Sequence, residues 1–234
     1  MSTITKKRMK FYVDIEHDCD VECPSEYSVF EFISRFDVGD QATLNKCSEL
    51  LDDPQHTEGQ TWWPLSCYRH GGEHWFRSDN RPAYADRWDT TKMAGVVHLV
   101  ATDGSDVQDD RDAAVDGFLE TYNLWCSGDT WWYDIRYDSP NTKQGTCPCC
   151  HTENTTREED HIEEYDSCGG FIGGEHVMEE VIRVFEGYRK DNPDFNDLYE
   201  IELKGDDAGK TLHDELTDSL RELGFRMSDD SNED

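Results

Sequence analysis

Apolar and polar residues alternate along two early segments of the chain, residues 9–15 and 28–34. Both segments are rich in β-branched and aromatic residues, and a period of two is typical of strands. Residues 40–52 have a different spacing, with Leu44 and Leu51 among the apolar residues that share one side at helical intervals. Because a Gly-Asp pair that can cap a helix opens this segment, we predict a short amphipathic helix there.

The middle of the chain predicts a hairpin, a buried strand and a helix. Residues 62–68 and 74–77 are expected to be the two strands of the hairpin, with a Gly-Gly pair at the turn. Residues 94–101 form a continuous apolar run, which indicates a strand buried on both faces in the middle of a sheet. Residues 109–127 carry acids in the first turn and apolar residues at helical spacing, so we predict a helix.

The C-terminal half predicts two further strand and helix pairs. Residues 131–137 have strand composition, and residues 164–167 are expected to begin the strand that pairs with them. Residues 175–188 follow a Gly-rich stretch and carry apolar residues on one helical face. Residues 198–203 and 211–223 predict a last strand and an acid-rimmed helix.

Together these elements predict an α+β fold, a mainly antiparallel sheet with two principal helices on one face. We expect a main domain over residues 1–190, interrupted by a polar, cysteine-rich hairpin insertion at residues 138–163. Residues 191–227 are expected to form a small C-terminal strand and helix unit, an acidic appendage to the main domain. Residues 228–234 are expected to be a disordered acidic tail.

The chain has few apolar residues, 35% of the total, so its hydrophobic core must be small relative to its polar surface. Seven Trp, ten Tyr and ten Phe offset this shortage, because aromatic side chains bury large areas. The 234 residues suit one main core with appendages.

Charge is the dominant feature of the composition. Against 53 Asp and Glu stand 22 Lys and Arg, a formal charge of −31 that disfavours direct binding to nucleic acid or anionic membranes. One explanation is adaptation to a salt-rich cytoplasm, since Asp is abundant and Lys is scarce. The other is recognition, in which the carboxylates imitate DNA phosphates and occupy the basic groove of a nucleic-acid-binding protein.

The sequence predicts a cytoplasmic protein. No run approaches the roughly 18 apolar residues that cross a bilayer, and the basic N-terminal residues lead into acids, so we expect neither a signal peptide nor a membrane anchor. Nine cysteines, several in close pairs, suit metal or free thiols better than a secreted disulfide framework.

The best chemical signal is a Cys-x-x-Cys pair followed by a histidine, which can present two thiolates to a tetrahedral zinc ion. This pair supplies half of a structural zinc site, and other cysteines and histidines could complete it. The candidate ligands are Cys147, Cys150, His151, His161, Cys19 and Cys23. A redox pair or free thiols are the alternative.

A second set of polar residues could serve a metal-dependent enzyme: His70, His74, Asp79, Asp86 and Asp89. No spacing such as His-Glu-x-x-His assigns them roles, and hairpin or surface residues are the alternative.

Two pairs of neighbouring tryptophans, Trp62-Trp63 and Trp131-Trp132, fall in predicted strands. Neighbours in a strand point to opposite faces. We expect one Trp of each pair to pack in the core and the other to cover an edge or meet a partner.

Five short segments combine aromatic, glycine and aspartate residues: residues 35–40, 64–72, 88–97, 122–133 and 166–173. In order and spacing they resemble the Arg-aromatic-x-x-Gly-Asp, Tyr-x-His-x-Gly, Trp-Asp...Gly, Leu-x-x-Gly-Asp and Asp-Ser-Cys-x-Gly-Phe motifs of a family of uncharacterised phage and prophage proteins. Gly169 stands where that family usually has Trp, and the cysteine-rich insertion lies outside the pattern.

The resemblance implies expression inside an infected host cell, in a family with no established activity. The leading hypothesis is therefore a non-enzymatic viral or mobile-element accessory protein that binds a host or viral protein with a basic surface. A more specific form of this hypothesis is an inhibitor that mimics DNA. The alternatives are the metal-dependent enzyme and a halophile-adapted, zinc-stabilised interaction module.

Overall fold

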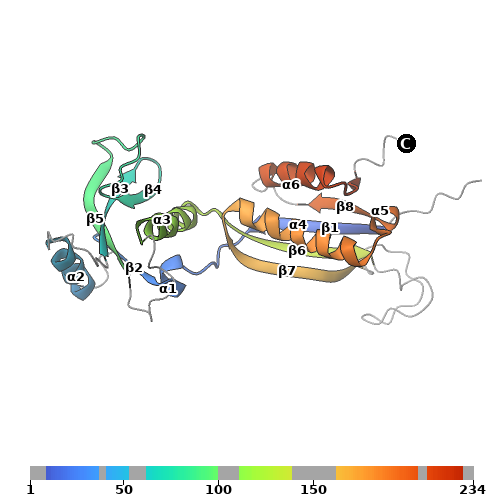
Figure 1. Ribbon diagram of the computed structural model, residues 1–234, viewed down its shortest axis with the longest axis horizontal. Helices are drawn as coiled ribbons and strands as arrows, with labels where there is room; N and C mark the ends of the chain where they lie inside the picture. Colours follow the sequence, from blue (N-terminus) through green and yellow to red (C-terminus); the bar gives the residue numbers. More distant parts are fainter. Residues whose placement is uncertain are drawn as a thin grey trace, which may run out of the picture. The chain divides into compact units, whose positions relative to one another are not determined.

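The structure is a computed structural model that describes residues 9–36, 41–52, 62–99, 111–138, 162–204 and 210–228 (Figure 1). The chain divides into two compact units. Unit 1 comprises Met1–Val21 and Thr130–Asp234, and unit 2 comprises Glu22–Asp129. Each unit holds a four-stranded sheet with helices, which confirms the predicted α+β class.

The sheet of unit 1 has the strand order β7-β6-β1-β8. Its strands are β1 (Met9–His17), β6 (Thr130–Asp138), β7 (Ile162–Ile172) and β8 (Tyr199–Lys204). Its helices are α4 (Gly174–Asp191), α5 (Phe195–Leu198) and α6 (Lys210–Glu222). β6 runs antiparallel to both of its neighbours, whereas β8 pairs with β1 in parallel.

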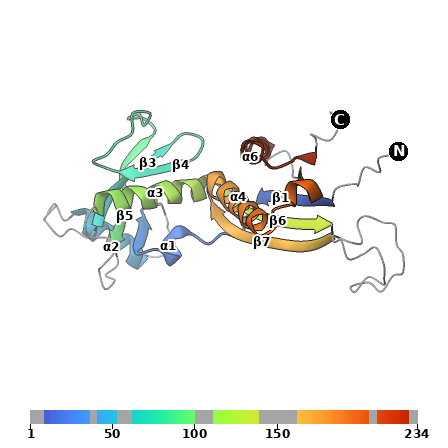
Figure 2. The ribbon, with the colours of Figure 1, turned by 45° about the vertical axis from the view of Figure 1, so that its right-hand side comes forward.

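The core of unit 1 lies between one face of this sheet and the helices (Figure 2). β1 alternates, so Phe11, Val13 and Ile15 are fully buried while the residues between them lie on the other face. Helix α4 meets this face with Val177 and Val181, one helical turn apart. Phe11 is the centre of an aromatic cluster, with ring centroids 5.1 to 5.6 Å away. These rings belong to Tyr137, Tyr165, Phe185, Tyr188, Phe195 and Tyr199.

The sheet of unit 2 is antiparallel and has the order β2-β5-β3-β4. Its strands are β2 (Phe30–Ser34), β3 (Trp62–Arg69), β4 (Glu73–Arg77) and β5 (Thr90–Leu99). Its helices are α1 (Pro24–Tyr27), α2 (Gln41–Asp52) and α3 (Arg111–Ser127). The hairpin of β3 and β4 and the central place of β5 confirm the sequence prediction.

Both faces of this second sheet are buried. Trp63 and Leu65 belong to the cluster that includes the apolar residues of α3. Trp62 belongs to a separate cluster with residues of α2. The adjacent tryptophans therefore pack into two cores, whereas in β6 Trp131 is buried and Trp132 is partly exposed.

Strand β4 lies at the edge of its sheet and is fastened to α3 by side chains. The amide of Asn123 accepts a hydrogen bond from the backbone N–H of Trp75 (2.7 Å) and donates one to the carbonyl of the same residue (2.8 Å). The largely buried Arg77 reaches Asp112 at 2.5 Å and Asp116 at 3.0 Å. These contacts satisfy polar groups that an edge strand would otherwise leave to water or to another chain.

The two-unit division corrects the expected single main domain of residues 1–190. Unit 2 is inserted between β1 and β6, which are neighbours in the sheet of unit 1. The insertion points are joined within unit 1, because Asp18 N–H donates to the Thr130 carbonyl (2.9 Å) and the Thr130 hydroxyl donates to the Asp18 carbonyl (2.7 Å).

The expected separate C-terminal unit, residues 191–227, is also corrected. Strand β8 pairs with β1, and Leu216 and Leu220 of α6 belong to the same core as Phe11. The apolar face of this segment is thus buried by the sheet of unit 1. Most of the expected cysteine-rich insertion, residues 139–161, and residues 229–234 lie outside the described residues.

Candidate protein-binding site

The predicted zinc ligands are only partly described. Cys147, Cys150, His151 and His161 lie outside the described residues. Cys19 is exposed and belongs to unit 1, whereas Cys23 belongs to unit 2, is half-buried and has its Sγ 3.1 Å from the Ser25 hydroxyl. Among the residues that the structure describes, no three His, Cys, Asp or Glu side chains are grouped as metal ligands. Zinc therefore stays a prediction.

The structure brings together only part of the second predicted set. The ring Nδ1 of His70 lies 3.1 Å from a carboxylate oxygen of Asp89. His74 is half-buried against the Tyr84 ring (centroids 5.3 Å apart), and burial lowers its pKa. Asp79 lies beside Arg77 at 3.7 Å.

Asp86 organises the loop that follows β4. Its carboxylate accepts hydrogen bonds from the backbone N–H groups of Asp89 (2.9 Å) and Trp88 (2.7 Å), and these bonds lower the pKa of Asp86. The backbone carbonyl of Asp86 accepts a hydrogen bond from the Thr90 hydroxyl. This is the local bonding by which Asp residues fix turns.

The same loop, residues 78–89, is anchored at other points. The Arg81 guanidinium donates to the carbonyl of Ala85, with its Nε at 2.6 Å, and the Ala85 side chain is buried. Arg69 N–H donates to the Asp89 carbonyl at 2.9 Å. The Tyr84 ring packs edge-on against Tyr68, 5.8 Å between centroids. The loop is therefore fixed both by bonds within itself and by contacts with Arg69 and Tyr68 of β3.

This ordered loop presents two large aromatic side chains to solvent. Trp88 is 79% exposed and Tyr84 is 54% exposed, more than any other large hydrophobic residue in the described part of the chain. The guanidinium of Arg87 lies over the Trp88 ring, 4.4 Å from its centroid. Trp, Tyr and Arg are the residue types enriched at the energetic centres of protein interfaces.

Sequence reasoning assigned no site role to Tyr84, Arg87 or Trp88. The available signal was the Asp-x-Trp-Asp segment, in which Asp86 can accept the N–H groups that follow it. The exposure of Trp88 has no local signature, because it depends on which side of the turn faces the rest of unit 2.

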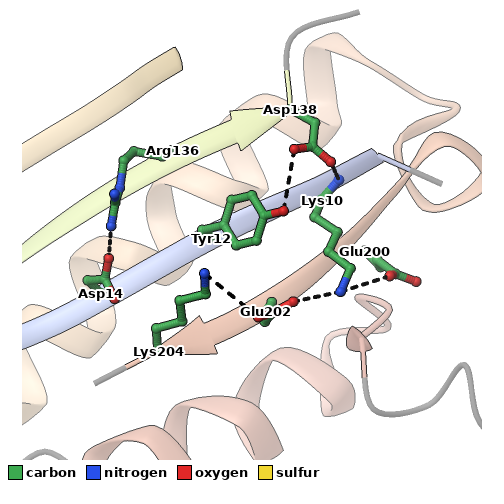
Figure 3. Close-up of polar contacts among 8 residues, drawn as sticks. All are labelled: Lys10, Tyr12, Asp14, Arg136, Asp138, Glu200, Glu202 and Lys204. Carbon is green, nitrogen blue, oxygen red and sulfur yellow. Dashed lines mark hydrogen bonds and ion pairs between the residues drawn. The ribbon is translucent and has the colours of Figure 1, made fainter. Parts of the chain in front are cut away.

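The open face of the unit 1 sheet shows how carboxylates are arranged elsewhere (Figure 3). Lys10 lies between Glu202 (2.6 Å) and Glu200 (3.8 Å), and Arg136 contacts Asp14 and Asp134. The Lys204 ammonium lies 4.2 Å from the centroid of the Tyr12 ring, and the Tyr12 hydroxyl donates to Asp138 at 3.4 Å. Each of the three cations on this face, Lys10, Arg136 and Lys204, lies beside at least one carboxylate.

Asp134 also lies beside a cation, yet its carboxyl group has a raised pKa. Burial raises its pKa, although Arg136 lies 3.0 Å away, and Asp14 and Glu164 add repulsion.

No family model, curated protein or solved structure matches the chain. The resemblance to phage proteins therefore stays a prediction from the motifs. Among the helices of the described residues, none combines the length and apolar composition needed to span a bilayer.

Proposed function

We propose that the chain is a non-enzymatic binding protein that docks onto a partner with a basic surface, with Trp88 and Tyr84 as its main contact residues. The observation that carries this proposal is the 79% exposure of Trp88 on a loop fixed by Asp86 and Arg81. In the infected cell implied by the phage resemblance, the partner would be a host or viral protein.

Two physical effects favour such binding: a preformed aromatic contact and the long-range electrostatic attraction of an acidic chain for a basic partner. An exposed Trp keeps a large apolar surface in water, and transferring it into a partner pocket gains free energy. Because the loop is already ordered, little conformational entropy is lost on binding. Both units are acidic, with 14 Lys and Arg against 32 Asp and Glu in unit 1 and 8 against 21 in unit 2. This charge would steer a basic partner toward the chain.

Imitation of DNA phosphates is the more specific form of the proposal. The pattern in Figure 3 supports it less well than an aromatic contact, because the carboxylates on the open face of the unit 1 sheet are interleaved with Lys10, Arg136 and Lys204. A neighbouring cation cancels much of the field of each paired carboxylate.

The test is an affinity capture from a lysate of the cell that naturally expresses the chain, with matched variants. Trp88→Ala should lose the captured partner, because truncation of a central interface Trp costs about 2 kcal/mol or more, roughly thirtyfold in affinity. Asp86→Ala should weaken capture less, because it frees the loop and leaves the aromatic side chains in place.

Leu198→Ala is the control, since Leu198 is also an exposed apolar residue (43%) but lies in unit 1. A partner counts as specific if wild type and Leu198→Ala capture it equally and Trp88→Ala does not. Capture should fall as salt rises toward about 1 M, where the Debye length is near 3 Å. Equal capture by wild type and Trp88→Ala would exclude the aromatic loop as the contact.

A further inference from the structure

A groove between β7 and α4 belongs to unit 1, whereas the aromatic loop belongs to unit 2. These two elements pack against each other along the edge of the sheet (Figure 2). The groove has a volume of about 560 Å³, within the range of sites that hold ligands. The residues that decide its chemistry are Tyr165, Asp166, Arg183, Gly187, Tyr188 and Asp191.

Two tyrosines give the groove its aromatic walls. The rings of Tyr165 and Tyr188 stand nearly perpendicular, at 85° and 5.1 Å between centroids. Tyr165 is 38% exposed, so its ring is available from the groove. The face of an aromatic ring carries partial negative charge and attracts ammonium and guanidinium groups.

Two carboxylates place full negative charges in the groove beside these rings. Asp166 is held by a hydrogen bond from the buried Tyr133 hydroxyl, at 2.8 Å. Asp191 is the last residue of α4, where the helix dipole disfavours a negative charge. Burial raises the pKa of Tyr165, and the nearby charges of Asp166 and Asp191 raise it further. The field in the groove is therefore negative.

Gly187 and Arg183 also shape the site. Gly187 is helical but has no side chain, and a Cβ built there meets nothing within 4 Å, so the groove stays open at this point. Arg183 is the only cation among the described residues of the lining, and one edge of its guanidinium, Nε and one Nη, donates to the two carboxylate oxygens of Glu180 of the same helix, with Nε 2.8 Å from Oε2. Its charge is largely neutralised by this pair.

We propose that this groove binds a Lys or Arg side chain of an extended basic segment in a partner protein. The cationic head lies against the Tyr165 ring and pairs with Asp191 and Asp166. The aliphatic stem occupies the space above Gly187. The site goes beyond the proposed function because it belongs to unit 1 and uses none of the residues of the aromatic loop.

The test is an NMR titration of the ¹⁵N-labelled full chain with the peptide acetyl-Gly-Arg-Gly-Arg-Gly-amide, and with the neutral peptide in which Gln replaces Arg. The expected result is saturable shifts at residues 165, 166, 187, 188 and 191 with the Arg peptide, and none with the Gln peptide. The titration is run at about 0.15 M salt, where the Debye length of about 8 Å limits diffuse attraction.

Three variants separate a built site from general acidity. Gly187→Leu fills the groove without changing charge and should weaken Arg-peptide binding about tenfold or more. Asp191→Asn should weaken it by about tenfold as well, while the melting temperature stays level or rises slightly, because an unfavourable dipole interaction is removed. Glu186→Gln removes the same charge from an exposed neighbouring position and should change affinity less than about twofold.

The proposal is wrong if Gly187→Leu folds and binds the Arg peptide as wild type does, or if Glu186→Gln weakens binding as much as Asp191→Asn. If Gly187→Leu fails to fold, the comparison of Asp191→Asn with Glu186→Gln decides. The peptide titration reports on unit 1 and the capture experiment on unit 2, so either proposal can fail without the other.

Discussion

The two units each build a four-stranded sheet but use the faces of those sheets differently. In unit 1, one face carries the aromatic core around Phe11, and the other carries alternating charges such as Lys10 and Glu202. In unit 2, both faces are buried, with Trp63 on the side of α3 and Trp62 on the side of α2. One sheet is thus amphipathic, and the other is a layer inside a sandwich.

This difference follows from the sequences of the strands. In β1, Phe11 and Val13 alternate with Tyr12 and Asp14, so only one face can leave water. In β5, Ala94–Val97 is a continuous apolar run, so both faces gain free energy from burial. A strand's pattern therefore predicts how many helical layers its sheet requires, even where the order of the strands is not evident.

The sharpest test of the comparison replaces neighbouring residues in one strand of each unit. Phe11→Ala should lower the free energy of unfolding by about 3 to 5 kcal/mol, because it leaves a cavity in the aromatic core. Tyr12→Ala, on the charged face, should cost about 1 kcal/mol or less. In unit 2, Trp62→Ala and Trp63→Ala should each cost about 3 to 5 kcal/mol. Urea denaturation followed by circular dichroism measures all four.

The prediction lies in the contrast within each pair. A Tyr12→Ala variant as unstable as Phe11→Ala would show that the charged face of the unit 1 sheet is covered in solution. A large difference between the two Trp variants would show that one of the two layers of unit 2 contributes little.

The attachment of the edge strand β4 gives a second, smaller test. Asn123→Ala removes both hydrogen bonds to the backbone of Trp75 and should lower the free energy of unfolding by about 1 to 3 kcal/mol. Asn123→Asp keeps the acceptor for the N–H but places a carboxylate against the Trp75 carbonyl, so it should recover only part of the loss. The amide of Trp75 should exchange faster with deuterium in Asn123→Ala, and unchanged protection there would contradict the role of Asn123.

Much of the local structure was predictable, because β1 and α4 have long, regular periods and β5 has a continuous apolar run. The division into units was not, because β1 and β6 pair across the whole of unit 2 and no local pattern encodes that pairing. Asp86 was identified as a polar candidate, but its role is to hold a turn. The exposed Trp88 was missed, since the same residue in the same loop could equally have been buried against β3 or β4.

The loss of stability at acid pH gives the smallest expected difference between the units. In unit 2, the ion pair of Arg77 and Asp112 helps to attach α3 to its sheet, whereas in unit 1 α4 packs on its sheet through apolar residues such as Val181. The bond from Arg77, followed by the bond from the Trp63 indole N–H (2.8 Å), lowers the pKa of Asp112.

A carboxyl group whose pKa is lowered in the folded state stabilises the fold at pH values above its unfolded-state pKa of about 3.9. That stability is lost as the pH falls through the folded-state pKa. Asp112→Asn should therefore lose less stability than wild type between about pH 6 and pH 3. The difference should be below about 1 kcal/mol, because the carboxylate is 58% exposed.

Urea midpoints at the two pH values measure the effect, with Glu120→Gln, an exposed position on the same helix, as the charge-matched control. An acid limb equally steep in Asp112→Asn and wild type would mean that the bond between Arg77 and Asp112 contributes nothing to the attachment of α3. The charged attachment of α3 to its sheet would then rest on Asp116, which lies 3.0 Å from Arg77.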